Sequence, residues 1–235
     1  MSQALYDELS ELYDLFYAYK DYAAEARAIR DLVHAAGIGD GARLVEAACG
    51  TGNHLVHLRS WFHTQGFDLA PGAARIAQSK GLDVRVADMR VHRFGPVDVV
   101  LCLFSSLGYV PPDALPAVAS HFAEGLRPGG LVVVEPWLHP DRIRVGHMSQ
   151  ETVEGPDLKA VRACVMERPE PRLSRFVYHI LVTRPTGVTY HVDPHELWLS
   201  TPEELLEVFD RAGFDARWED PGLTGRGLIV GRKRG

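Results

Sequence analysis

Residues 44–54 read LVEAACGTGNH, an apolar run that stops at two glycines separated by one residue. Residues 44–48 predict a buried strand, Gly50 and Gly52 predict a tight turn, and a helix is expected from Asn53. A glycine-rich turn between a strand and a helix is where α/β sheets bind nucleotide-like ligands, at the carboxyl ends of their strands. The turn therefore predicts a ligand that approaches the backbone closely: a dinucleotide, a phosphate, or an adenosine without phosphate.

The alternation of strand and helix continues on both sides of this turn. Two helices are predicted first, over residues 3–18 and 21–36, from their apolar periodicity. Alternating strands and helices are typical of βαβ units, which place a parallel sheet between two layers of helices. The sequence therefore predicts an α/β fold with a doubly wound, mostly parallel sheet. The predicted strands cover residues 43–48, 64–68, 83–87, 97–103 and 130–136, and the helices between them cover residues 53–62, 71–80 and 112–126.

The pattern changes between residues 138 and 199. Apolar and polar residues alternate there, and the turn sequences EGPD, RPEP and RPTG interrupt them, which is typical of an antiparallel meander. A helix over residues 201–212 and two final strands follow. We therefore expect a single domain over residues 1–235, in which an antiparallel β cap at residues 138–199 is inserted after the fifth strand of the sheet.

The composition argues against several classes of function. The 235 residues are 46% hydrophobic and carry a net charge of −6, which indicates one substantial core and no basic surface for nucleic acid. The acidic N-terminus lacks the pattern of a secretory signal, and no apolar run approaches the roughly 20 residues that span a bilayer. The three cysteines have no metal-type spacing, so we expect a reduced, cytoplasmic protein without membrane contact.

Acidic residues lie around the predicted turn. A dehydrogenase would carry glycine or alanine where this chain has Leu55, and a phosphate-binding loop would need a Gly-Lys-Ser/Thr triplet, which is absent. Glu46 lies within the first strand, Asp68 ends the second, and Asp88 follows the third. A carboxylate after the second strand can accept hydrogen bonds from both ribose hydroxyls. These residues favour a cationic ligand without phosphate, such as S-adenosylmethionine.

The motifs EAACGTG, GFDLA, ADMR and LRPGGLVVVEPW resemble, in order and spacing, those of class I S-adenosylmethionine-dependent methyltransferases. More narrowly, ELYDLFY, KDYAAEA, CLFSSLGY, VVVEPW and GRGLIVG are similar to the N,N-dimethyltransferases of nucleotide-linked amino sugars, whose best known members make desosamine and mycaminose on dTDP-linked sugars. The resemblance covers nearly the whole chain. It implies the seven-stranded class I methyltransferase fold, S-adenosylmethionine as cofactor and the amine of a dTDP-linked amino sugar as acceptor, and it allows a homodimer.

The resemblance also implies roles for individual residues. Tyr17 and Glu135 are expected to orient the acceptor amine and to accept its proton directly or through water, and Arg226 to bind the diphosphate. The expected cofactor-binding residues are Tyr22, Glu46, Ala48, Gly50, Gly52, Asp68, Leu69, Asp88, Met89 and Leu103. The expected catalytic residues are Tyr17, Tyr109 and Glu135, the expected substrate-binding residues are Tyr17, Glu135, Trp137 and Arg226, and no metal site is expected.

Three positions depart from the pattern of the family. Glu46 stands where the first strand often has aspartate, Ala48 where many members have glycine, and Tyr109 where the sugar enzymes carry a histidine of the active-site region. His191 and His195 are four residues apart on a predicted strand, so they point to the same face. We expect this pair to face solvent or substrate rather than a metal.

Other interpretations stay open at this point. A protein of this fold could methylate a different small molecule, or bind the cofactor without catalysis. A nicotinamide-dependent oxidoreductase would use the same turn, but Leu55 argues against it. A nucleic-acid methyltransferase would need a basic face or an Asn/Asp-Pro-Pro-Tyr motif, which the sequence YVPPD is not. Turnover of labelled cofactor separates an enzyme from a binding protein.

Overall fold

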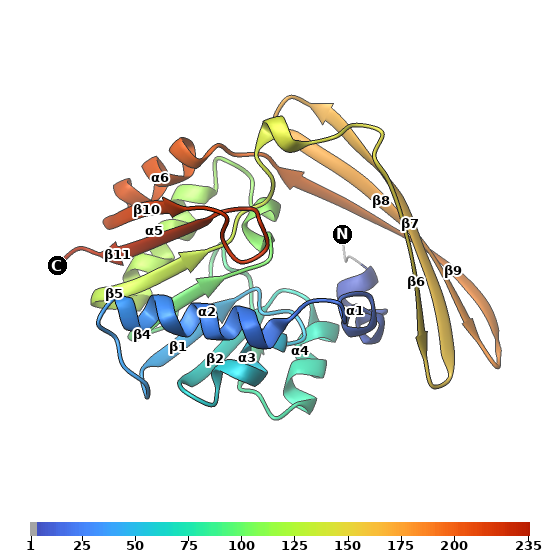
Figure 1. Cartoon of the computed structure of the whole chain (residues 1–235), viewed down its shortest axis with the longest axis horizontal. Helices are drawn as coiled ribbons and strands as arrows, with labels where there is room; N and C mark the ends of the chain where they lie inside the picture. The colour runs from blue at the N-terminus through green and yellow to red at the C-terminus, as the bar shows by residue number, and fades with distance from the viewer. Residues whose placement is uncertain (1–3) are drawn as a thin grey trace.

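A seven-stranded sheet forms the centre of the molecule (Figure 1). The computed structural model describes residues 4–235, so residues 1–3 of the predicted domain, and with them the first residue of the predicted 3–18 helix, lie outside the described residues. The strand order is β10-β11-β5-β4-β1-β2-β3, and β11 runs antiparallel to both of its neighbours while the other pairs are parallel. The predicted α/β fold with a mostly parallel seven-stranded sheet is therefore confirmed. The strands are β1 (Arg43–Ala47), β2 (His63–Asp68), β3 (Val84–Val86), β4 (Val97–Cys102), β5 (Leu126–Val134), β10 (Phe214–Glu219) and β11 (Leu228–Lys233).

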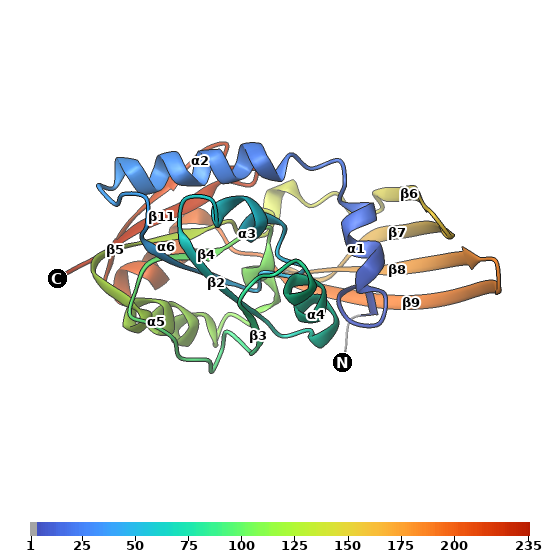
Figure 2. The ribbon, with the colours of Figure 1, turned by 90° about the horizontal axis from the view of Figure 1, so that it is seen from below.

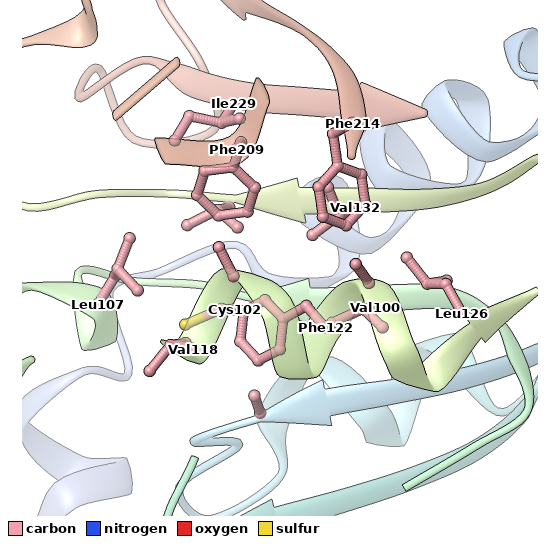
Figure 3. Close-up of a cluster of buried hydrophobic side chains, with 14 of the residues drawn as sticks. Val100, Cys102, Leu107, Val118, Phe122, Leu126, Val132, Phe209, Phe214 and Ile229 are labelled. Atoms are coloured by element: carbon pink, nitrogen blue, oxygen red, sulfur yellow. The ribbon is translucent and has the colours of Figure 1, made fainter. Parts of the chain in front are cut away.

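Helices cover both faces of this sheet because its strands are apolar on both sides. In β4, Val99 and Leu101 point toward one face and Val100 and Cys102 toward the other, since successive strand residues alternate. Figure 3 shows the second of these cores, where Phe122 lies in one cluster with Val100 of β4 and Val132 of β5. The first face is covered by α2 (Tyr22–Ala35), α3 (Asn53–Leu58) and α4 (Pro71–Ser79), and the second by α5 (Leu115–Gly125) and α6 (Pro202–Arg211).

A second sheet forms the predicted antiparallel cap. Its strands follow β5 in the chain and precede α6, as expected, and they extend away from the central sheet as a long blade (Figure 1). The inner face of the blade packs on the N-terminal segment, where Ile180 and Val182 meet Leu12 and Phe16. The four strands, in spatial order, are β6 (Met148–Gly155), β7 (Leu158–Glu170), β8 (Leu173–Arg184) and β9 (Gly187–Trp198).

The prediction of one continuous helix over residues 3–18 is wrong. The segment consists of a short 3-10 helix, η1 (Ala4–Tyr6), and a separate helix, α1 (Ser10–Phe16). The break lies at residues 7–9, where the Asp7 carboxylate accepts from Gly72 N of α4 at 2.9 Å. The carboxylate of Asp193 on β9 accepts, at 2.9 and 3.0 Å, from the backbone amides of Ala4 and Leu5, which are free at the start of a helix. As Figure 2 shows, this places α1 between the cap and α4, at the edge of the central sheet where the parallel strands end.

Neither a membrane-spanning helix nor a metal cluster is found within residues 4–235. No helix in this range is long and apolar enough to cross a bilayer. No three histidine, cysteine, aspartate or glutamate side chains of these residues gather closely enough to hold a metal ion.

Candidate functional site

A cavity of 510 Å³ lies at the carboxyl ends of the parallel strands, beneath the N-terminal segment. All the predicted cofactor-binding residues except Gly52 line this cavity, and so does Tyr109. Its wall also contains residues that sequence reasoning did not select, chiefly Tyr6, Tyr13 and Phe104. No local pattern marks them, because they come from the N-terminal segment and the loop after β4 and meet only in the folded chain.

The two glycines of the turn serve different purposes. Gly50 has φ +55°, and a Cβ built on it would find no atom within 4 Å, so its bare backbone faces open space in the cavity. Gly52 has φ +79°, and a Cβ there would lie 2.3 Å from Leu82 Cδ1 and 3.2 Å from Ala77 Cβ. Gly50 therefore leaves open space at the cavity, whereas Gly52 permits tight packing of the chain and is not among the residues that line the cavity.

Asp68 is held at the end of β2 by backbone amides. Its Oδ2 accepts from Gly50 N at 2.7 Å and its Oδ1 from Ala70 N at 2.8 Å. Burial raises the pKa of Asp68, against the opposing effect of these amides. Since each carboxylate oxygen can accept a second hydrogen bond, Asp68 stays available to ligand hydroxyls. Asp88 differs, because hydrogen bonds from Arg90 lower the pKa of Asp88 and tie its carboxylate to that side chain.

A buried histidine joins two glutamates behind the turn. His54 Nε2 lies 2.8 Å from Glu25 Oε2, and His54 Nδ1 lies 3.2 Å from Glu46 Oε1. Burial lowers the pKa of His54, but the two glutamates outweigh it and raise that pKa to about 9. The second oxygen of Glu46 is buried at the cavity wall and has no hydrogen-bond partner within residues 4–235. It is therefore placed to receive a cationic group of a ligand.

Glu135 accepts hydrogen bonds from the loop that follows β4 and from Thr224. Its side chain is completely buried, and Oε2 accepts from Phe104 N at 3.0 Å. Its Oε1 accepts from the backbone and hydroxyl of Thr224, at 2.9 and 2.6 Å. Phe104 and Ser105 both have positive φ, +49° and +72°, a conformation that non-glycine residues adopt only when their surroundings hold it. Both carboxylate oxygens of Glu135 are thus engaged within the protein, where they hold this turn, and Glu135 is not among the residues that line the cavity.

Tyr17 also lies behind the wall. The centroid of its ring lies 4.6 Å from that of Tyr13 and 5.2 Å from that of Phe104. Within residues 4–235, Tyr17 does not belong to the residues that line the cavity. Its hydroxyl accepts from Arg162 Nη1 at 3.2 Å. Of the two tyrosines, Tyr13 faces the cavity directly, and Tyr17 supports it.

Arg226 lies over two aromatic rings. Its guanidinium is 5.0 Å from the centroid of Phe104 and 5.5 Å from that of Trp137. Its Nε is buried and has no hydrogen-bond partner in the described part of the chain. The indole of Trp137 donates to Ser174 Oγ at 2.8 Å, so Trp137 is a fixed platform beneath Arg226. Three arginines of the cap, Arg162, Arg175 and Arg184, are already paired with Glu151, Glu196 and Glu11.

The two histidines of the cap have different surroundings. His191 lies near the surface, but His195 is completely buried, so the expectation that both face solvent or substrate is wrong for His195. Its Nδ1 lies 2.7 Å from the hydroxyl of Tyr109, and its Nε2 lies 3.0 Å from Asp193 Oδ2. The register of the long antiparallel strands puts His195 on the inner face of the cap, beside the cavity wall.

Comparison with known proteins shows what this chain is similar to. Residues 19–219 match the family described as a methyltransferase domain. The chain is 36% identical to the dTDP-3-amino-3,6-dideoxy-alpha-D-glucopyranose N,N-dimethyltransferase of Streptomyces fradiae, covering 95% of this chain and 90% of the relative. It is also 36% identical to the dTDP-3-amino-3,4,6-trideoxy-alpha-D-glucopyranose N,N-dimethyltransferase of Streptomyces venezuelae, over 94% and 96%.

A solved crystal structure is also similar to this chain over nearly its whole length. The crystal structure of Streptomyces venezuelae DesVI superposes with a TM-score of 0.87 at 34% identity, covering 95% of this chain and 98% of that one. The central sheet, the cap and the glycine turn are therefore a shared architecture, and this chain belongs to the methyltransferase family.

Proposed function

We propose that this chain methylates the amine of a nucleotide-linked amino sugar, with S-adenosylmethionine as the methyl donor. The observation that carries the proposal is the 36% identity, over 95% of the chain, to a relative that is named for N,N-dimethylation of a dTDP-linked 3-amino sugar. The similarity covers both the central sheet and the cap. It therefore includes the segments that we expect around the acceptor as well as those around the cofactor.

The residues of the cavity fit this cofactor. Gly50 leaves open space for a ligand beside its backbone, Asp68 presents carboxylate oxygens to a ribose, and the unpartnered oxygen of Glu46 suits an ammonium group. Leu69, which is 62% exposed, and Met89 offer apolar surface for adenine on the cavity wall. When bound, S-adenosylmethionine supplies a methyl group on a positively charged sulfur, which is the electrophile of the reaction.

For the acceptor amine, correct position matters more than acid–base catalysis. An amine attacks a sulfonium methyl when it is neutral, aligned and about 3–3.5 Å away, which is catalysis by proximity. Tyr13 and Tyr109 line the cavity and can hold such an amine, while Tyr17 and Glu135 keep the surrounding wall in place. We further propose that Arg226 binds the diphosphate, because its Nε is unpartnered and guanidinium groups bind phosphates in a bidentate manner.

The test is turnover of the purified protein with S-adenosylmethionine and a panel of dTDP-linked amino sugars, followed by mass spectrometry of the products. Added methyl groups on the amino sugar support the proposal, and their number distinguishes one methylation from two. Methylation of other amines only would keep the enzyme and change the substrate. Cofactor binding without turnover on any amine would indicate a binding protein instead.

A further inference from the structure

A line of four polar side chains runs from the interior of the cap to the cavity. Asp193 and His195, both on β9, are completely buried, and Asp193 Oδ2 lies 3.0 Å from His195 Nε2. On the other side of the ring, His195 Nδ1 lies 2.7 Å from the hydroxyl of Tyr109. That hydroxyl lies 3.2 Å from the hydroxyl of Tyr6, and both tyrosines line the cavity.

The surroundings of His195 fix the direction of these hydrogen bonds. Its ring stacks on Phe176, with 5.0 Å between centroids and 15° between planes, so the orientation of its two nitrogens is set by packing. An ionised carboxylate can only accept hydrogen bonds, so Nε2 carries the proton donated to Asp193. Nδ1 then accepts from the Tyr109 hydroxyl. The Tyr6 hydroxyl, 3.2 Å away, donates to the Tyr109 oxygen, which keeps one lone pair for a donor in the cavity.

We propose that Asp193, His195 and Tyr109 form a relay that takes a proton from the acceptor amine during methyl transfer. The inference rests on the proposed function, because it needs an amine bound in the cavity beside Tyr109. In this relay Tyr109 is the catalytic residue, and His195 and Asp193 are positioning residues that act through it. Burial raises the pKa of the Tyr109 phenol well above its usual value, so Tyr109 passes a proton on and does not rest as a phenolate.

The relay accounts for every proton and charge. An amine that gains a methyl group becomes a cationic ammonium, and it must lose one proton before its nitrogen can accept a second methyl group. As that proton moves to the Tyr109 oxygen, the Tyr109 proton moves to His195 Nδ1. One positive charge thus passes from the substrate nitrogen to the imidazole, where Asp193 stabilises it. The proton leaves to solvent after the product has left.

The other groups around His195 are three tyrosines, one phenylalanine and one arginine. Asp193 is held in place by the amides of Ala4 and Leu5, which also brings Tyr6 to the Tyr109 hydroxyl. The arginine contacts the ring of Tyr178, whose centroid lies 5.0 Å from that of His195. The groups are Tyr6 on η1, Tyr109 on the 3-10 helix η2 (Ser106–Tyr109), Phe176 and Tyr178 on β8, and Arg162 on β7, whose guanidinium lies 4.4 Å from the Tyr178 ring.

Tyr109→Phe tests the relay, because it removes one oxygen atom and keeps the ring. We expect kcat on a dTDP-linked amino sugar to fall about 10²-fold near neutral pH, the lower end for a single acid–base group, with little change in the KM of the sugar. The variant should recover activity as the pH rises past the pKa of the substrate's own ammonium, because the amine then arrives without its extra proton. His195→Gln, checked for folding by circular dichroism, should show the same loss and recovery.

The chain offers a matched control for the tyrosine–histidine pair. Tyr190 is hydrogen-bonded to His179 on the exposed outer face of the cap, so Tyr190→Phe removes the same kind of bond away from the cavity. We expect this variant to keep the kcat and the pH profile of the wild type.

Nitrogen NMR of the ligand-free protein gives a readout that does not depend on turnover. His195 should carry a proton on Nε2 and none on Nδ1, and its Nδ1 resonance should shift in Tyr109→Phe. A proton on Nδ1 in the resting protein would overturn the relay, as would a Tyr109→Phe enzyme with wild-type kcat and pH profile. A wild-type protein that methylates no amino sugar would contradict the proposed function instead, and the NMR result would still decide whether His195 can accept the Tyr109 proton.

Discussion

Replacement of His54 by glutamine should remove a contribution to the stability of the protein that depends on pH in a defined window. In the folded chain Glu46 and Glu25 raise the pKa of His54 from its usual 6.5 to about 9. Because a tenfold change in proton affinity corresponds to about 1.4 kcal/mol, the protonated ring stabilises the fold by about 3 kcal/mol. The folded state binds this proton more tightly than the unfolded state does. The stabilisation is therefore complete below pH 6.5, declines as the pH rises, and is lost above about pH 9.

The measurement is urea unfolding of the wild type and His54→Gln between about pH 6 and about pH 10. The difference between their free energies of unfolding should shrink by about 3 kcal/mol across this range, because other groups titrate equally in both proteins. The control is His57→Gln on the same helix, since His57 has no carboxylate partner within residues 4–235. A wild-type advantage over His54→Gln that stays constant from pH 6.5 to pH 9 would refute the assigned charge of the buried ring.

Three further predictions concern the ligands and the loop after β4. Asp68→Asn should weaken S-adenosylmethionine binding about 10-fold in calorimetry, because charge-assisted hydrogen bonds become neutral ones; unchanged affinity would remove Asp68 from the ribose site. Arg226→Ala should raise the KM of a dTDP-linked sugar far more than it lowers kcat, since it binds a remote group equally in the ground and transition states, and an unaltered KM in steady-state kinetics would mean that the diphosphate lies elsewhere. Glu135→Gln should lower the free energy of unfolding by about 2 kcal/mol in urea titrations, because a glutamine cannot accept from both Phe104 and Thr224; wild-type stability would show that the loop needs no carboxylate.

Local sequence determined the central part of the fold and the positions of several residues that line the cavity. Apolar runs of strand length, separated by amphipathic helices, can bury their side chains only in a parallel sheet that is covered on both faces. Because parallel strands all end at the same edge, the turn at Gly50, the aspartate that ends β2 and the aspartate that follows β3 must lie close together there. These features depend on short segments and on a rule of geometry, so they are readable before any tertiary contact is known.

Tertiary structure alone decided which polar groups meet across long stretches of chain. His54 pairs with Glu25, 29 residues earlier, Tyr109 with His195, 86 residues later, and Glu135 with Thr224, 89 residues later. No periodicity encodes such pairs, because they depend on how the cap and the N-terminal segment dock on the sheet. The predicted first helix is divided at residues 7–9, where Asp7 accepts from Gly72 N of α4, and Asp193 accepts from the free amides at the start of the segment. The local preference for helix is small, so tertiary contacts that only the folded chain supplies can override it.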